Sequence, residues 1–137
     1  MAIIPLKSLV GKAIISISVN SNKTALLLET LDKDYYDTEG VYMLVASAEC
    51  CSESWFEHIS NIDAYGRINK VETIVIDEDA PGTRQDKDEI YSLKFTTDKG
   101  TMEVEMRNSS NGFYGGSIEL YQLPAINLRF KPLKKDY

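Results

Sequence analysis

The chain has 137 residues, 43% hydrophobic and 26% charged, which is enough to bury one core and too short for two ordinary domains. Its net charge of -6 disfavours binding to duplex nucleic acid or to an anionic membrane, because both are negatively charged. The sequence has neither the apolar run of a signal peptide nor a stretch of about 18 apolar residues that could span a membrane. We therefore expect one β-rich domain, residues 1–137, in the cytoplasm.

Residues 12–29 predict a β-hairpin. Ile15, Ile17 and Val19 alternate with serines, as in a strand with one buried face, and the next four residues favour a turn. A second apolar run, residues 25–28, completes the hairpin.

Residues 32–40 are acidic and rich in turn formers, which predicts an exposed loop with Tyr35 and Tyr36 folded back onto the body. Residues 41–48 are strongly apolar and predict a central strand that leads into the two cysteines. The segment around Trp55 and Phe56 fits a capped helix and a short strand equally well.

Residues 61–66 predict a turn, and residues 71–76 a strand. Residues 77–88 contain Pro81-Gly82, five acidic residues and almost nothing apolar, so we expect a mobile surface loop.

The clearest hairpin follows. Residues 91–96 and 102–107 alternate apolar and polar side chains on either side of an Asp98-Lys99-Gly100 turn. Residues 117–123 predict a last strand, and residues 124–137 a partly extended tail that carries the cations Arg129, Lys131, Lys134 and Lys135.

These elements predict an α+β fold with little helix. About seven short strands would form a mainly antiparallel twisted sheet or a partly open barrel.

The segment 107–117 is the strongest candidate for a ligand site. Arginine can clamp an anion, glycines permit close backbone approach, amides and hydroxyls form hydrogen bonds, and an aromatic ring can stack on a flat ligand. The candidate ligand-binding residues are Arg107, Asn108, Ser110, Asn111, Gly112, Tyr114, Gly115 and Ser117. The alternative is a long hairpin connection, with a tight turn at Asn111-Gly112 and the aromatic rings packed on the sheet edge.

The cysteines indicate neither a metal site nor a catalytic residue. Cys50, Cys51, Glu53 and His58 are chemically suitable metal ligands, but adjacent cysteines on a strand would point to opposite faces, which favours two buried structural thiols. A Cys51–His58 dyad would lack a third group to orient it. We expect no enzyme, metal or cofactor.

Three features together resemble a phage-encoded domain family of unknown function: Cys50-Cys51 followed by Glu53, the strand at 91–97 with its Lys99-Gly100 turn, and the segment 110–116. That family has a Cys-Cys-Glu run and a Ser-Asn-Gly-Tyr-Tyr loop. The resemblance spans residues 9–120, with Ser52 inserted before Glu53 and Phe113 in place of the first tyrosine.

The resemblance implies a small protein that acts by binding in the cytosol of a bacterial host. Our first hypothesis is that it sequesters a nucleotide-like defence signalling molecule without turnover, with Arg107 on the phosphate and Tyr114 stacked on the base. A pocket shared between two copies would make it a homo-oligomer. The alternative is an acidic inhibitor that binds a host protein, through residues 77–88 among others.

Overall fold

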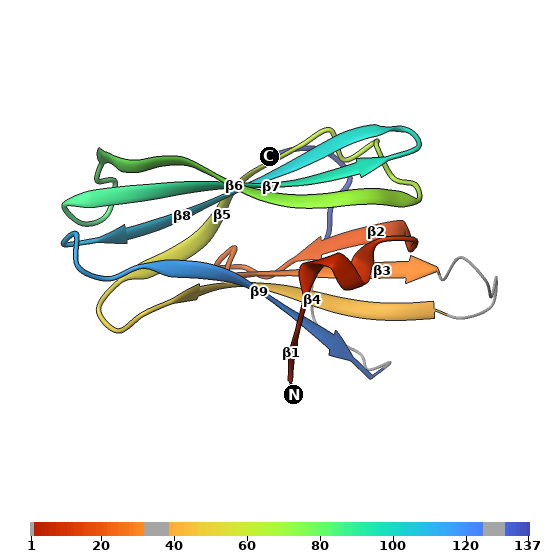
Figure 1. The fold of residues 1–137 in the computed structure, drawn as a ribbon, viewed down its shortest axis with the longest axis horizontal. Helices are drawn as coiled ribbons and strands as arrows, with labels where there is room; N and C mark the ends of the chain where they lie inside the picture. The colour runs from red at the N-terminus through yellow and green to blue at the C-terminus, as the bar shows by residue number, and fades with distance from the viewer. Residues whose placement is uncertain (1, 32–38, 125–130) are drawn as a thin grey trace.

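A computed structural model of the chain describes residues 2–31, 39–124 and 131–137. Two antiparallel sheets face each other in it, as the upper and lower layers of Figure 1. Neither sheet closes into a barrel, and the described residues form ten strands instead of about seven. The predicted β-rich, antiparallel architecture with little helix is confirmed. The α+β label is only loosely matched, since helix in the described residues is limited to one short 3-10 turn, η1 (Leu6–Leu9). No described helix has the length and apolar character needed to cross a bilayer.

The first sheet has the strand order β1-β9-β4-β3-β2-β10. Its strands are β1 (Ile3–Ile4), β2 (Ala13–Val19), β3 (Ala25–Leu31), β4 (Glu39–Ala48), β9 (Gly116–Leu123) and β10 (Lys131–Pro132). The predicted hairpin β2–β3, the central strand β4 and the late strand β9 are all confirmed. The alternation in β2 differs from the prediction, because a bulge at Ile15 leaves that side chain 41% exposed and places Ile14 and Ile17 in the core.

The second sheet has the order β5-β8-β7-β6, a Greek-key arrangement. Its strands are β5 (Glu53–Ser60), β6 (Ile68–Pro81), β7 (Lys87–Thr97) and β8 (Gly100–Ser110). The predicted β7–β8 hairpin is confirmed, and the segment that fitted a helix or a strand is strand β5. The expected turn at residues 61–66 connects β5 to β6.

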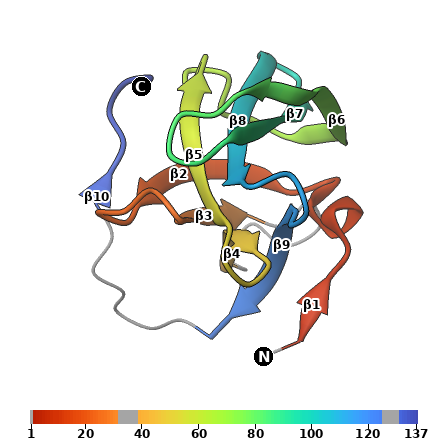
Figure 2. The same cartoon turned by 90° about the vertical axis from the view of Figure 1, so that its left-hand side faces the viewer.

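A single core lies between the two sheets. Leu26, Leu28 and Leu44 from the first sheet are at most 1% exposed, as are Phe56 and Phe95 from the second. Burial of large side chains like these contributes about 1.5–3 kcal/mol each. Figure 2 shows the two layers end on, with the strands of one sheet crossing over those of the other.

The acidic segment 77–88 is not the mobile loop that its composition suggested. Strand β6 continues to Pro81 and β7 begins at Lys87, so only residues 82–86 connect them. This short loop is anchored: the Arg84 guanidinium stacks 3.8 Å from the centre of the Trp55 ring, and Gln85 Nε2 donates to the Cys51 carbonyl at 2.8 Å. Pairing with β7 therefore overrides the loop-like composition.

The tail beyond Pro124 docks on both sheets. Strand β10 pairs with β2, and the Leu133 N–H donates to the Ile17 carbonyl. Tyr137 exchanges two backbone hydrogen bonds with Ile59 of β5. The described residues of the expected tail are thus extended. Arg129 of the tail lies outside the described residues, and so do Tyr35 and Tyr36 of the predicted loop.

Candidate functional site

Three connections lie at one end of the molecule, at the left of Figure 1 and toward the viewer in Figure 2. They are the β4–β5 turn (49–52), the β6–β7 loop (82–86) and the β8–β9 loop (111–115). The Glu49 N–H donates to the Gly115 carbonyl at 3.0 Å, so two of them are hydrogen-bonded. Because β8 and β9 belong to different sheets, the segment 107–117 is not the hairpin connection that we considered. It carries the chain from one sheet to the other.

Arg107 forms ion pairs with two carboxylates. Its Nε lies 3.1 Å from Glu105 Oε2 and its Nη1 3.4 Å from Asp88 Oδ2, and the side chain is only 22% exposed. Burial by itself would lower the pKa of Arg107, but these hydrogen bonds raise it, so the guanidinium stays protonated. Its charge is therefore balanced within the protein and is not presented to a phosphate group.

Asp88 is the buried centre of this end of the second sheet. Its side chain has no exposed surface. Burial would raise the pKa of Asp88, but hydrogen bonds from Ser109, from Thr83 and from Arg107 lower it below its usual value. The Thr83 hydroxyl donates to Oδ2 at 2.7 Å, and the Thr83 N–H to Oδ1 at 3.1 Å. Sequence reasoning missed this residue because two of its partners, Arg107 and Ser109, come from another strand.

Asn108 links the β8 strand to the β4–β5 turn. Its Nδ2 donates to the hydroxyls of Ser52 and Ser54, at 3.0 and 2.9 Å, and the side chain is fully buried. Its Oδ1 has no hydrogen-bond partner among the described residues. The contacts of Asn108 are therefore structural, and the residue is not available at the surface as a ligand contact.

Gly116 is required by the close approach of the two sheets. A Cβ atom there would lie 2.5 Å from Ser54 Oγ, 2.8 Å from the Ser47 carbonyl oxygen and 2.9 Å from Asn108 Nδ2. We expect Gly116→Ala to lower the free energy of unfolding in urea by about 1–3 kcal/mol through overpacking. Gly115→Ala is the matched control, because its Cβ would have ordinary contacts of 3.6 Å. Equal stability of the two variants would contradict the close packing at Gly116.

Two predicted ligand residues, Ser110 and Gly112, line a cavity of about 330 Å³. The rest of its lining is Glu78, Asp79, Lys87 and Glu89. Lys87 Nζ lies 2.9 Å from Asp79 Oδ1, and this salt bridge raises the pKa of Lys87. The cavity thus holds three carboxylates against one cation.

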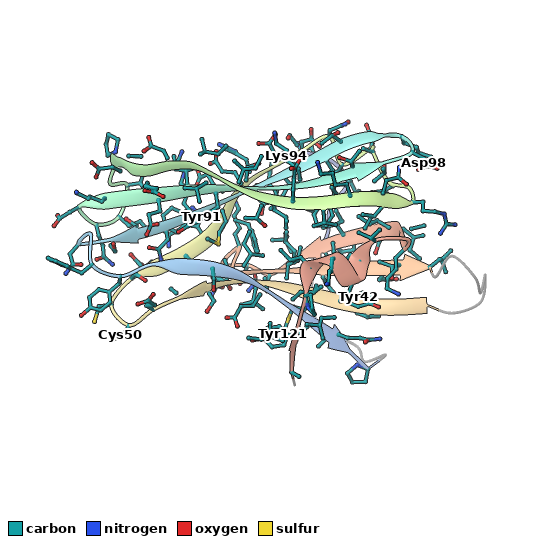
Figure 3. The ribbon with its side chains drawn as sticks, in the orientation of Figure 1. Tyr42, Cys50, Tyr91, Lys94, Asp98 and Tyr121 are labelled. Atoms are coloured by element: carbon teal, nitrogen blue, oxygen red, sulfur yellow. The ribbon has the colours of Figure 1, made fainter. Side chains whose placement is uncertain are left out.

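The neighbouring Tyr91, labelled in Figure 3, lies in the same negative potential. Burial raises the pKa of its phenol, and so do the hydrogen bond to Glu89 and the nearby carboxylates Glu78 and Glu49. A cavity with these charges favours a cation over a phosphate.

Of the other predicted ligand residues, Asn111, Tyr114 and Gly115 lie on the β8–β9 loop and Ser117 lies at the start of β9. Asn111 accepts a hydrogen bond from the Phe113 N–H, and Ser117 pairs with Ser47 in the first sheet. Phe113 is 86% exposed and Tyr114 37%, so the Phe113 ring does not pack on a sheet edge. The eight predicted residues therefore do not form one site. Arg107 lies in ion pairs, Asn108 in a buried hydrogen-bond network, Ser110 and Gly112 in the acidic cavity, and the remaining four on the loop or at the start of β9.

The cysteines differ from the prediction of buried structural thiols. Both Cys50 and Cys51 are exposed, and they lie in a turn where their sulfur atoms are 3.0 Å apart. Cys51 contacts Cys50, whereas His58 lies on β5 opposite Glu105. Among the described residues no cluster of three or more histidine, cysteine or acidic side chains could hold a metal ion.

Strand β6 is the feature that sequence reasoning did not single out. It is an edge of the second sheet, and its consecutive side chains Ile74, Val75 and Ile76 are 37%, 45% and 57% exposed. Residues 70–75 pair with β7 in unbroken register, and register shifts follow between Val75 and Asp77 and between Asp77 and Ala80. The run of apolar residues between turn-forming residues predicts the strand itself. That this strand lies at the edge of the sheet follows only from the strand order.

The backbone of β6 offers unused hydrogen-bonding groups. The Asp98 N–H donates to the Arg67 carbonyl, and in an antiparallel pair every second residue of β7 from Asp98, namely Thr96, Lys94 and Ser92, then faces β6. Their partners on β6 are Lys70, Glu72 and Ile74, because a bulge between Ile68 and Lys70 shifts the register by one residue. We therefore infer that the residues between these partners, Val71, Thr73 and Val75, direct their N–H and C=O groups away from β7. A free, apolar edge of this kind is a template for another strand.

Comparison with known proteins identifies a family but no activity. A family model described as a domain of unknown function, DUF7448, matches residues 7–120. The chain is also similar to an uncharacterized protein of Acanthamoeba polyphaga mimivirus, with 33% identity over 94 residues that cover 64% of this chain and 74% of that protein. No solved structure matches significantly. The expected membership of a family of unknown function is confirmed, the similar protein is viral, and the phage origin stays a prediction.

Proposed function

Because the chain belongs to the DUF7448 family of domains of unknown function, we propose from its own geometry that it is a non-catalytic protein-binding module. Strand β6 would accept an extended, basic segment of a partner protein as an additional antiparallel strand. The observation that carries this proposal is the free edge at residues 70–76, with three exposed apolar side chains directly before Asp77, Glu78 and Asp79.

The charges favour a basic partner. Glu72 is paired with Lys70, and Asp79 with Lys87, so Asp77 and Glu78 supply the unbalanced negative charge beside the edge. The net charge of -6 adds a long-range field that attracts cations and repels a second copy of the same chain. Backbone hydrogen bonds would give affinity, and lysines or arginines opposite the acidic segment would give specificity.

This proposal develops the alternative that the sequence raised, an acidic protein that binds a host protein. The viral origin of the similar protein fits such a role. A nucleotide ligand receives less support, because Arg107 is neutralised by Asp88 and Glu105 and the adjacent cavity is acidic.

The test uses fluorescent peptides of alternating lysine and valine, with glutamate and valine peptides of equal length as the control. We expect saturable binding of the basic peptide, measured by fluorescence anisotropy, at least tenfold tighter than that of the acidic peptide and weaker at high salt. Thr73→Pro should abolish binding without unfolding the protein, since proline removes an outward N–H at an edge position.

Thr73→Ala is the matched control and should bind like the wild type. Equal binding of both peptides, or undiminished binding by a folded Thr73→Pro variant, would refute strand addition at β6. A thermal-shift experiment with a nucleotide panel and with the basic peptide tests the other hypothesis. Stabilisation by a nucleotide, with no effect of the basic peptide, would support the small-molecule function instead.

A further inference from the structure

The two cysteines occupy the centre of a tight turn. The Ser52 N–H donates to the Glu49 carbonyl at 3.0 Å, which defines a β-turn with Cys50 and Cys51 at its central positions. Cys51 has φ of +74°, while Cys50 is not among the residues with positive φ. This is the pattern of a type II turn, in which glycine or asparagine is usual at the second central position. A side chain in this conformation costs free energy, and such strain is concentrated at functional sites.

The turn also brings the thiols together. Adjacent side chains on a strand diverge, whereas here the two sulfur atoms are 3.0 Å apart and both residues are exposed. Figure 3 shows Cys50 at the outer tip of this connection, away from the core. An oxidant in solution can therefore reach both sulfur atoms.

We propose that Cys50 and Cys51 form a reversible redox site, which converts between a dithiol and a disulfide between adjacent residues by exchange with small-molecule disulfides. This activity is separate from partner binding at β6.

The exchange balances in two steps. The Cys50 thiolate attacks one sulfur of a disulfide such as oxidised glutathione, forms a mixed disulfide and releases one glutathione thiolate. The Cys51 thiolate then attacks the Cys50 sulfur, forms the Cys50–Cys51 bond and releases the second. Two electrons pass from the protein to glutathione, and the two cysteine protons leave to the released thiolates.

The contact between the two sulfur atoms, together with the pKa of Cys51, favours Cys50 as the first nucleophile. A hydrogen bond with Cys50, and then the charge of Cys50, raise the pKa of the Cys51 thiol. The proton therefore stays on Cys51 while Cys50 reacts. Formation of the mixed disulfide removes the Cys50 charge, and with it one cause that holds the proton on Cys51.

Ring closure would affect the neighbouring loops. A disulfide between adjacent residues closes an eight-membered ring that contains the Cys50–Cys51 peptide bond, and the strain makes the disulfide easy to reduce. The Cys51 carbonyl accepts from Gln85, and the same turn is bonded to Gly115 through Glu49. Oxidation that changes the turn conformation would thus alter its hydrogen bonds to the β6–β7 and β8–β9 loops.

The experiment equilibrates the full chain with reduced and oxidised glutathione at several ratios, traps free thiols by alkylation and measures intact mass. We expect the wild type to accumulate a species lighter by two hydrogen atoms, with no alkyl or glutathione group, and to return to the dithiol on addition of dithiothreitol. Cys51→Ser should stop at a glutathione adduct on Cys50. Cys50→Ser should likewise stop at a glutathione adduct, on Cys51, because neither single-cysteine variant can close the ring.

Three results would overturn the proposal: two alkylated thiols in the wild type at every glutathione ratio, only glutathione adducts, or only disulfide-linked dimers. Because both cysteines are exposed, the serine variants should fold, and the thermal midpoint of each verifies this.

Discussion

Replacing Asp88 with alanine should lower the free energy of unfolding by about 3–5 kcal/mol, the usual cost of breaking a buried ion pair by removing one partner. The substitution leaves Arg107 without one of its carboxylates and leaves the hydroxyls of Thr83 and Ser109 without their acceptor. Urea denaturation at neutral pH measures the effect. Asp86→Ala removes the same charge from an exposed position two residues away, and we expect it to change stability by less than about 0.5 kcal/mol.

The pH dependence gives a second measurement of the same contact. The pKa of Asp88 is lowered in the folded protein, so its stabilisation is complete above the pKa of the unfolded chain, near 3.8, and is lost as pH falls through the folded-state pKa. The difference between wild type and Asp88→Ala should therefore be constant from pH 7 to about pH 5 and shrink below about pH 4. Asp136, whose pKa is lowered by the N–H groups of Ile62 and Asn61, contributes equally to both proteins and cancels. A difference that grew in acid would contradict an ionised, hydrogen-bonded Asp88.

Tyr137→Ala is expected to cost about 2–4 kcal/mol, because the tyrosine ring packs against the core and protects the outer edge of β5. Its hydroxyl donates to the Phe56 carbonyl at 3.1 Å, and Lys23 Nζ lies 4.4 Å from the ring centre. Burial, with a smaller contribution from Glu57, raises the pKa of Tyr137 to about 12, so this donor persists into the alkaline range.

Tyr137→Phe is the matched variant, since it keeps the ring and loses one hydrogen bond worth about 1 kcal/mol. Thermal and urea unfolding of the two proteins separate the contribution of the ring from that of the hydroxyl. Equal stability of both variants would show that the ring adds little. The comparison also bears on the proposed function. The edge of β5 is covered by Tyr137 and by Lys23, whose carbonyl accepts from the Phe56 N–H, whereas β6 is bonded to residues 11–12 only at Ile68 and is an edge strand at residues 70–76.

Local patterns were sufficient for the two hairpins. In β7 and β8 the alternating residues predicted the buried face correctly, with Leu93, Phe95 and Val104 at most 1% exposed. The register there is set by a short turn, so no distant contact was needed. The bulge at Ile15 could not be predicted in this way, because it depends on how β2 pairs with β3.

The candidate site was less predictable because its residues are defined by distant partners. A run of acidic residues is typical of a loop, and only pairing with β7 makes residues 77–81 a strand. The burial of Asp88 depends on Arg107 and Ser109 from β8. Likewise, the cysteines were expected to diverge because a strand was assumed, whereas a turn places them together.

The chain passes between sheets at 49–52 and again at 111–115, so the whole second sheet is an uninterrupted segment inserted between two neighbouring strands of the first, β4 and β9. Bringing β4 and β9 together must close a very long loop, at an entropic cost that short hairpins do not have. The inserted segment contains its own local meander, β6–β7–β8, which can form before that closure. From this connectivity we expect the inserted sheet to compact first and to bring β4 and β9 close enough to pair.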